Sequence, residues 1–305
     1  MLVFSEREID LDLLPQDVRL VRLEGTNYSE IEVAVCSRGK AIKLANMELP
    51  RLKLVQLTST GYDGVPLYEF SKKGIQVANA PGVYGIPIAE TVVFGILQMA
   101  KKYRSNPNNR CVRFTRKYFH ICELAEKTVL IIGAGNIGTE VARRLAAFQM
   151  RILGYDIAVS VKESFDQMLN NRGDLKAALP TCDYVVCTLP ATSETQGFVN
   201  RELIACMKKS SVFVNMGRRA AINESDLYQA LKEKAIGGAI LDMFEWLPNP
   251  ITNSFRRLKN VVVFPGVAAI SRESDFRLEQ LIAKNIISIL NKMPAEHVLN
   301  RIGDQ

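Results

Sequence analysis

Short apolar runs alternate with amphipathic segments of helical spacing along most of the chain. Strands are predicted at residues 32–36, 54–58, 75–78, 129–132, 151–155, 184–189, 212–215, 238–243 and 261–264. Helices are predicted at residues 65–73, 86–104, 224–234 and 275–291, and from Ile137 onward. Apolar runs of this length are typical of strands buried in parallel sheets. Strands that alternate with helices form doubly wound sheets, so the pattern predicts an α/β fold.

The residues that end these strands are the first candidates for a site. Ligands of doubly wound sheets bind at the carboxyl ends of the strands. The residues in question are Gly133, Asp156, Leu189, Pro190, Gly217, Arg218, Asp242, Pro265 and Gly266.

The turn after residues 129–132 carries Gly133, Gly135 and Gly138 at the spacing G-x-G-x-x-G. The first glycine permits the tight turn, the second lets the backbone approach a pyrophosphate, and the third lets helix and strand pack closely. The N-terminus of the following helix favours phosphate. With a second strand and a terminal acid in order, the pattern predicts a dinucleotide site. A glycine-rich strand–helix turn of another α/β protein is the alternative.

The acid of this pattern is Asp156, 18 residues past Gly138. At this point an acid can accept hydrogen bonds from a ribose 2′-hydroxyl. Residues 157–160 read Ile-Ala-Val-Ser, so no arginine follows to neutralise a 2′-phosphate. The sequence therefore predicts NAD as the cofactor rather than NADP.

Composition narrows the class of protein. The 305 residues suffice for one large or two medium domains, and 48% hydrophobic with 23% charged residues is ordinary for a soluble protein. No apolar run reaches the ~20 residues of a membrane span, and the N-terminus lacks a signal-peptide pattern. The six cysteines form no C-x-x-C pair, and the two histidines, His120 and His297, form no metal-ligand cluster. We interpret the chain as a cytoplasmic protein with reduced thiols and no membrane partner.

The net charge of +7 is concentrated in one segment, residues 101–117, which contains seven lysines and arginines and no acid. Such a stripe can be a solvated arm, or it can bind an anionic small ligand or nucleic acid. A solvated arm is the preferred interpretation, and nucleic acid is the least favoured.

Further motifs accompany the glycine pattern in a fixed order. They are residues 59–63 (STGYD), 79–82 (NAPG), 88–90 (IAE), 155–156 (YD), 189–190 (LP) with Thr195 beyond them, 215–218 (NMGR), and 241–245 (LDMFE) followed by Pro248. In this order the chain resembles the D-isomer-specific 2-hydroxyacid dehydrogenases over roughly residues 55–300.

The resemblance implies an architecture of two doubly wound parallel-sheet domains. A Rossmann NAD-binding domain at residues 87–274 would be inserted in a flavodoxin-like substrate domain at residues 1–86 and 275–305. A homodimer would form on the nucleotide domains and the arm near residues 105–125. The implied reaction is hydride transfer between NAD(H) and the α-carbon of a small anionic substrate, a 2-keto or 2-hydroxy acid.

The resemblance also implies roles for single residues. Arg218 matches the catalytic arginine, whose donor fork holds the substrate carboxylate and keto oxygen. A surface or inter-domain ion pair is the alternative for this residue. The backbone of Ser59, Thr60 and Gly61 would bind the substrate carboxylate. The expected cofactor contacts are Gly133, Gly135, Asn136, Ile137, Gly138, Asp156, Leu189, Pro190, Thr195, Met216, Asp242 and Gly266, with Asp242 at the nicotinamide amide.

The acid/base pair of the family has no counterpart in this chain. In ungapped register, Leu247 stands at the position of the family's glutamate and Gly266 at that of its histidine. Glu245, His120 and His297 lie out of register. We expect Glu245 to be a supporting or surface acid and the two histidines to lie at a surface or interface.

Arg219 is a further departure, because the family usually has glycine after its arginine. Its charge beside Arg218 would suit a multiply anionic ligand, unless the side chain points to solvent.

Two hypotheses therefore concern function. A positioned acid/base contributes ~10²–10⁴ in rate, so its loss predicts a dehydrogenase with weakened or altered proton delivery, in which a water or the substrate's own acid supplies the proton. The alternative is a catalytically silent NAD(H)-binding protein that serves regulation or assembly. Nucleic-acid binding through residues 101–117 is a third, less favoured possibility.

Overall fold

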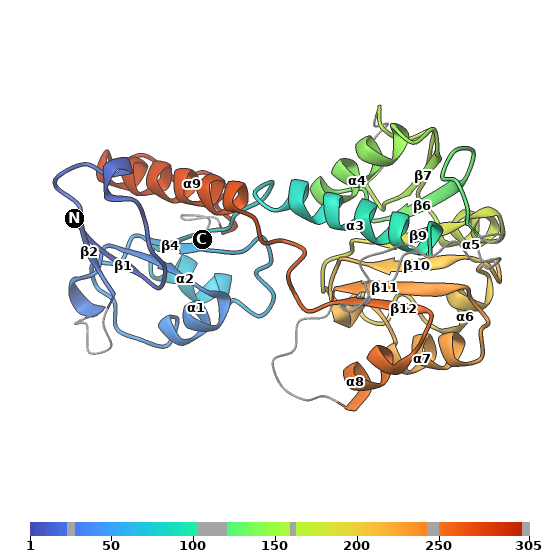
Figure 1. Ribbon diagram of the computed structural model, residues 1–305. Helices are drawn as coiled ribbons and strands as arrows, with labels where there is room; N and C mark the ends of the chain where they lie inside the picture. Colours follow the sequence, from blue (N-terminus) through green and yellow to red (C-terminus); the bar gives the residue numbers. More distant parts are fainter. Residues whose placement is uncertain (23–27, 103–120, 159–162, 243–249, 301–305) are drawn as a thin grey trace. The chain divides into compact units, whose positions relative to one another are not determined.

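The computed structural model describes residues 1–22, 28–102, 121–158, 163–242 and 250–300. The chain divides into two compact units, residues 1–84 with 270–305 and residues 85–269. The boundaries expected from the sequence fall after residues 86 and 274. Each unit is built on one parallel sheet (Figure 1), which confirms the predicted α/β fold class with two parallel-sheet domains.

The sheet of the first unit has the order β2-β1-β3-β4-β5, with all neighbouring pairs parallel. Its strands are β1 (Leu2–Ser5), β2 (Arg19–Val21), β3 (Val33–Cys36), β4 (Leu54–Leu57) and β5 (Gln76–Ala78). Its helices are α1 (Arg38–Leu44), α2 (Leu67–Lys72) and α9 (Arg272–Leu290), with short 3₁₀ turns η1 (Leu11–Leu13) and η2 (Tyr28–Glu30). The sequence analysis misses β1, β2 and α1, which are short.

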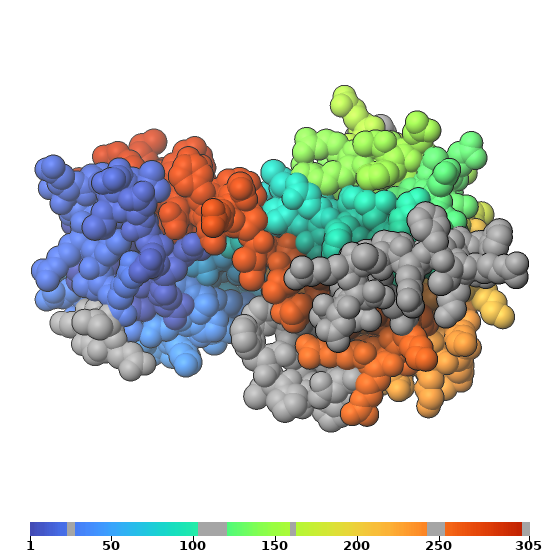
Figure 2. All heavy atoms as spheres, in the orientation of Figure 1, coloured from blue at the N-terminus to red at the C-terminus, as the bar shows by residue number. Residues whose placement is uncertain are grey.

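Side chains of both faces of this sheet are buried. Val55 and Leu57 of β4 belong to one apolar cluster with residues of α1 and α2. Val3 and Val35 belong to a second cluster with residues of α9. Figure 1 shows α9 on one face of the sheet and α1 with α2 on the other. In Figure 2 the side chains of α9, in red, pack against the N-terminal residues of the same unit, in blue.

The segment after α9 returns to the edge of this sheet. Ala78 of β5 forms an antiparallel bridge with Val298, and the Leu299 N–H donates to the Val77 carbonyl at 2.7 Å. The buried Asn300 side chain accepts from the Val77 N–H at 2.7 Å. The sheet is therefore completed by residues far from it in sequence.

The sheet of the second unit has the order β12-β11-β10-β9-β6-β7-β8. Its strands are β6 (Thr128–Ile132), β7 (Arg151–Tyr155), β8 (Gln167–Leu169), β9 (Tyr184–Cys187), β10 (Val212–Asn215), β11 (Gly238–Asp242) and β12 (Val261–Phe264). Its helices are α3 (Gly85–Ala100), α4 (Asn136–Ala146), α5 (Arg172–Ala178), α6 (Arg201–Ala205), α7 (Glu224–Lys232) and α8 (Pro250–Arg257), with 3₁₀ turns η4 (Leu179–Thr181) and η5 (Arg219–Ala221). The chain direction along the sheet reverses between β6 and β9, where doubly wound sheets bind ligands.

The structure gives the C-terminal end of α3 and the N-terminal cap of α7. The helix predicted at residues 86–104 is α3, which ends at Ala100. Asn223 caps α7, because its side chain accepts from the Asp226 N–H at 3.2 Å. Gly95 lets α3 lie close to the sheet, since a Cβ there would be 2.8 Å from Ile240 Cγ2.

Among the described residues, no helix is both long enough and apolar enough to cross a membrane. The basic segment 101–117 lies outside the described residues beyond Lys102.

Candidate dinucleotide and substrate site

The glycine turn after β6 is built so tightly that side chains cannot replace two of its glycines. Gly133 has φ +99°, a conformation that favours glycine. A Cβ on Gly138 would lie 2.1 Å from the Gly133 carbonyl oxygen. A Cβ on Gly135 would meet nothing within 4 Å. Gly135 therefore faces open space, as a glycine over which a pyrophosphate passes must.

The N-terminus of α4 opens from this turn. The Thr139 N–H bonds to the Gly135 carbonyl at 2.9 Å. The N–H groups of Asn136, Ile137 and Gly138 donate to no acceptor within the described part of the chain. Free N–H groups at a helix start suit an anion.

Asp156 follows β7 and lies beside the glycine turn. Its Oδ2 accepts from the Ala134 N–H at 2.9 Å and its Oδ1 from the Ala158 N–H at 3.0 Å. The side chain is half-buried. The structure therefore brings together the acid and the glycines, 18 or more residues apart in sequence.

The ends of β6, β9 and β10 meet at the same edge. Thr188 Oγ1 donates to the Gly133 carbonyl at 2.6 Å, and the Arg218 N–H donates to the Leu189 carbonyl at 3.1 Å. A Cβ on Gly217 would lie 2.6 Å from the same Leu189 oxygen. Thr188 is a residue that the sequence analysis missed, because a lone threonine after a strand carries no signal.

The loop after β9 is held by its own threonine. Thr195 Oγ1 donates to the Pro190 carbonyl at 2.6 Å and accepts from the Thr192 N–H at 2.8 Å. Pro190 is exposed, whereas Met216 is buried and anchors its N–H on the Cys187 carbonyl at 3.0 Å. Thr195 thus shapes the loop that carries Pro190.

The charge of Arg219 is neutralised by an acid of the same unit, Glu224. Its Nε and Nη2 donate to the two oxygens of Glu224 at 2.7 and 2.6 Å, in a bidentate pair. Neither interpretation made from the sequence, an additional charge for the ligand or a side chain in solvent, describes this arginine. Arg218 is half-buried at the start of η5.

Asp242 ends β11 and is the most unusual acid of this edge. Its Oδ1 is buried and has no hydrogen-bond partner within the described residues. Burial raises the pKa of this carboxyl, and hydrogen bonds from the backbone of Gly266, Ala268 and Val267 act in the opposite direction. An orphaned buried oxygen fits an amide donor supplied by a ligand.

Gly266 lies beside Asp242 and has φ +74°. A histidine at this position would adopt a backbone conformation that L-residues rarely occupy. The sequence register, which places Gly266 at the position of the family's histidine, does not predict this positive φ. Leu247 and Glu245 lie outside the described residues, as does His120, whereas His297 is exposed in the first unit. No cluster of metal-binding side chains occurs among the described residues.

The loop after β4 in the first unit is polar and half-buried. Its carbonyl groups are all engaged. Ser59 O accepts from the Ala80 N–H at 3.1 Å, Thr60 O from Asn79 Nδ2 at 2.7 Å, and Gly61 O from Ser59 Oγ at 2.8 Å. The backbone N–H groups of Ser59, Thr60 and Gly61 donate to no acceptor in the described residues. Three consecutive free N–H groups suit a carboxylate.

A cavity of about 1080 Å³ lies elsewhere in the second unit, and no residue of the predicted site lines it. It is lined by α3 and β12 residues, among them Phe94, which is 53% exposed. Phe94 and Phe264 pair with ring centroids 6.1 Å apart. This apolar surface on α3 and β12 therefore belongs to a feature other than the cofactor edge.

Comparison with known proteins settles the family. Residues 92–268 match the model of the D-isomer specific 2-hydroxyacid dehydrogenase NAD-binding domain. The chain belongs to this family. A glyoxylate reductase of Pyrococcus horikoshii is 32% identical over 93% of this chain and 84% of its own length. Residues 92–268, which lie in the second unit, thus match the NAD-binding domain of this family.

Two further relatives bear on the extent of the match. A D-3-phosphoglycerate dehydrogenase of Archaeoglobus fulgidus is 32% identical over 82% of this chain but only 47% of its own length. The chain therefore spans about half the length of the phosphoglycerate dehydrogenases it matches. A family member of Aeromonas salmonicida of known structure superposes with a TM-score of 0.82 at 25% identity, over 98% of both chains.

Proposed function

We propose that this D-2-hydroxyacid dehydrogenase family member transfers hydride between NAD(H) and a small 2-keto or 2-hydroxy acid, by a route that does not use the family's histidine. The family and its neighbours are NAD-dependent dehydrogenases that act on CH–OH groups. The observation that carries the proposal is the intact cofactor edge, in which the glycine turn, Asp156 and the orphaned Asp242 oxygen lie in one sheet.

The residues present fit the cofactor at several points. Asp156 can accept from ribose hydroxyls, the N–H groups at the start of α4 can donate to phosphate, and Asp242 Oδ1 can accept from the nicotinamide amide. Gly135, Leu189, Pro190, Thr195, Met216 and Gly266 are the proposed further contacts. When bound, NAD(H) supplies or accepts the hydride at the α-carbon.

The substrate is held by two kinds of donor in this proposal. Arg218 offers a planar fork of N–H groups, which matches a carboxylate and the neighbouring keto oxygen better than a lysine does. The free N–H groups of Ser59, Thr60 and Gly61 donate to the carboxylate. As negative charge develops on the keto oxygen, the Arg218 guanidinium stabilises it. With glycine at residue 266, a water or the substrate's own acid delivers the proton.

The test is a kinetic comparison of two neighbouring arginines. NADH oxidation is measured with glyoxylate, pyruvate and hydroxypyruvate, and NADH binding by fluorescence. Arg218→Lys should lower kcat/KM about 100-fold, because the fork to a charged group is worth on the order of 3 kcal/mol, while NADH binding is unchanged. Arg219→Lys, which can keep its pair with Glu224, is the matched control and should stay within twofold.

The second candidate is an NAD(H)-binding protein without turnover, which the positive φ of Gly266 favours. It would be preferred if wild-type protein binds NADH but oxidises it with none of the keto acids. Imidazole added to the wild-type reaction separates a missing proton donor from a wholly altered site, since it restores only the former.

The expected homodimer is part of the proposal, and its interface is the apolar surface on α3 and β12. The half-exposed edge strand β12 and the exposed Phe94 support it. Phe94→Glu should lower the molar mass in light scattering to that of one chain, 34.1 kDa. The cytoplasmic location and the role of residues 101–117 stay predictions. Salt-sensitive binding of DNA would be required for a nucleic-acid role.

A further inference from the structure

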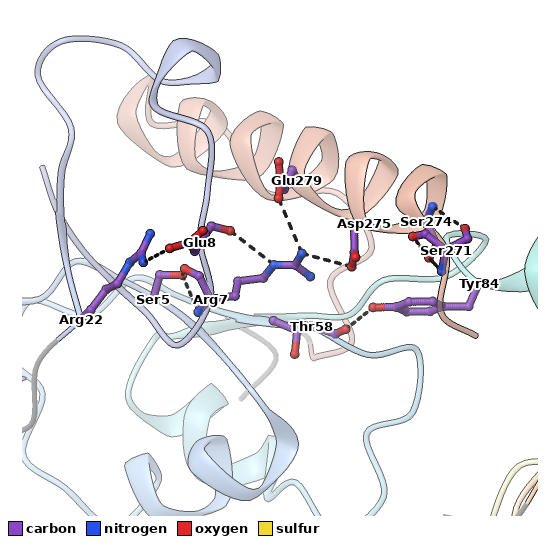
Figure 3. A network of polar contacts seen from close by, with 10 residues as sticks. All are labelled: Ser5, Arg7, Glu8, Arg22, Thr58, Tyr84, Ser271, Ser274, Asp275 and Glu279. Atoms are coloured by element: carbon purple, nitrogen blue, oxygen red, sulfur yellow. Dashed lines mark hydrogen bonds and ion pairs between the residues drawn. The ribbon is translucent and has the colours of Figure 1, made fainter. Parts of the chain in front are cut away.

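Tyr84 connects the end of the first unit to the loop after β4. It is the last residue of the unit before α3 begins. Its hydroxyl donates to the Thr58 carbonyl at 2.5 Å (Figure 3). Thr58 directly precedes the loop Ser59–Gly61, and its own N–H donates to the Cys36 carbonyl at 3.1 Å. The peptide groups on both sides of Thr58 are therefore fixed.

The geometry of the peptide bond gives this contact a consequence. A peptide group is planar and trans, so its C=O and the next residue's N–H point in opposite directions. A donor that holds the Thr58 carbonyl thus fixes the direction of the Ser59 N–H. In the same way, the Ala80 N–H on Ser59 O fixes the Thr60 N–H. Asn79 Nδ2 on Thr60 O fixes that of Gly61.

The residue before Tyr84 is fixed by a hydrogen bond from α9. The carbonyl of the buried Val83 accepts from Arg277 Nε and Nη2 at 3.2 and 2.9 Å. Arg277 belongs to α9, which begins with a capping box between Ser271 and Ser274. Figure 3 shows this helix start beside Tyr84.

The start of α9 also forms ion pairs with the segment that follows β1. Arg7 Nη2 lies 3.2 Å from Asp275 Oδ1 and 3.6 Å from Glu279 Oε1 (Figure 3). Burial raises the pKa of Tyr84, with a smaller lowering by Arg7 and raising by Asp275. The tyrosine hydroxyl therefore keeps its proton and donates throughout the neutral range.

We propose that Tyr84 is a positioning residue that aims the Ser59 N–H, and with it the free N–H groups of the loop, at the substrate carboxylate. This inference rests on the proposed function, which assigns the carboxylate to Ser59, Thr60 and Gly61. Tyr84 touches neither the carboxylate nor the cofactor in this role. Tyr84 acts through the Thr58 carbonyl. The N–H groups of the loop Ser59–Gly61 make the contact with the carboxylate.

The test uses Tyr84→Phe, which keeps the ring and removes the hydroxyl. KM for glyoxylate should rise about tenfold with kcat within twofold, because a hydrogen-bond contribution of ~1–1.5 kcal/mol is lost from ground and transition state alike. NADH affinity should be unchanged, and Tm should fall by ~2–4 °C because the hydrogen bond to the Thr58 carbonyl is lost. Tyr68→Phe is the matched control, since Tyr68 is 69% exposed in the same unit. Arg277→Gln, which frees Val83, should raise KM in the same direction by less.

A second measurement does not depend on turnover. In the unliganded protein, NMR relaxation should give the Ser59 N–H an order parameter near the ~0.85 of rigid backbone in the wild type, falling toward ~0.6 in Tyr84→Phe. An unchanged order parameter overturns the proposal, and so does a lower one with an unchanged KM. If the wild type reduces no keto acid, the proposed function fails separately. Calorimetric binding of oxalate then replaces KM, and equal oxalate affinity in both proteins overturns the role of Tyr84.

Discussion

The two ends of the seven-stranded sheet's carboxyl edge differ in the groups that they present to a ligand. At β6, β7 and β9 the contacts are made by backbone groups, by close-packed glycines and by one acid that binds backbone N–H groups. At β11 and β12 the acid Asp242 has an oxygen with no hydrogen-bond partner among the described residues, and Gly266, with φ +74°, stands where the sequence register predicts the family's histidine. Holding a dinucleotide depends on backbone shape, which many sequences preserve. Moving a proton depends on single side chains, which one substitution removes.

The largest effect on NADH binding should come from adding a side chain inside the glycine turn. In Gly138→Ala the new Cβ meets the Gly133 carbonyl 2.1 Å away, so the turn must shift, at a cost of about 3 kcal/mol or more. NADH affinity should fall more than 100-fold in a fluorescence titration, and Tm should fall with it.

Gly135→Ala sharpens this result, because its Cβ meets no protein atom within 4 Å. It should leave Tm unchanged and still weaken NADH binding, since the methyl group enters the space of the pyrophosphate. Gly39→Ala, a glycine in α1 with open space around it, should leave NADH affinity unchanged, with a small rise in Tm because alanine is favoured over glycine in a helix. Normal NADH affinity in Gly135→Ala would show that the cofactor does not cross this turn.

A tenfold loss of NADH affinity is expected from changing the residues proposed to contact the ribose. Asp156→Ser removes the carboxylate that lies beside the glycine turn, and Ile157→Arg places a cation where a 2′-phosphate would lie. The double variant should bind NADH about tenfold more weakly, with a loss of ~1.4 kcal/mol, and NADPH more tightly. Dissociation constants for both nucleotides check this. A wild type that already prefers NADPH would contradict the role of Asp156.

Restoring the histidine should not restore the family's activity. Gly266→His places a side chain at φ +74°, which costs about 1–2 kcal/mol of unfolding free energy. Gly266→Ala should lose the same amount in urea denaturation, because the cost lies in the backbone. We expect less than a tenfold gain in glyoxylate reduction. A stable, 100-fold faster histidine variant would mean that only the side chain has diverged.

The smallest effect concerns Asp242, whose pKa is raised in the folded protein mainly by burial. The folded state then favours the neutral acid, so this group's contribution to stability is full below the unfolded pKa of about 3.9 and is lost as pH rises through the folded value. Asp242→Asn should match wild type at pH 3 and be more stable than wild type at pH 7. Thermal unfolding across this pH range measures it. NADH should bind the variant more weakly.

The sequence predicted the elements that have a strong local pattern. The strands around Gly133 and Asp156 follow from apolar runs and glycine spacing. Strands β1, β2 and β8 were not predicted, although strands as short as β4 and β5 were, so length alone does not explain the difference. Their partners are set by tertiary pairing.

The site was predictable where contacts are local and unpredictable where they join distant residues. The bonds of Tyr84 to Thr58 and of Arg277 to Val83 span 26 and 194 positions, and no motif marks either side chain. The pair between Arg219 and Glu224 spans only five positions, yet no sequence motif marks it, because Glu224 lies beyond the 3₁₀ turn η5, at the start of α7. The positive φ at Gly266 has no signature beyond the glycine itself.

The return of the chain after α9 has a consequence for biosynthesis. One face of the five-stranded sheet is covered by α9, and its edge strand β5 pairs with residues near Val298. A ribosome releases residues 1–84 first, yet their sheet lacks this cover until residues 270–300 have emerged. The NAD-binding domain, whose residues are contiguous, can complete its core during synthesis. Residues 1–84 are thus made before the NAD-binding domain but complete their fold after it, and one apolar face of their sheet stays uncovered until residues 270–300 have emerged.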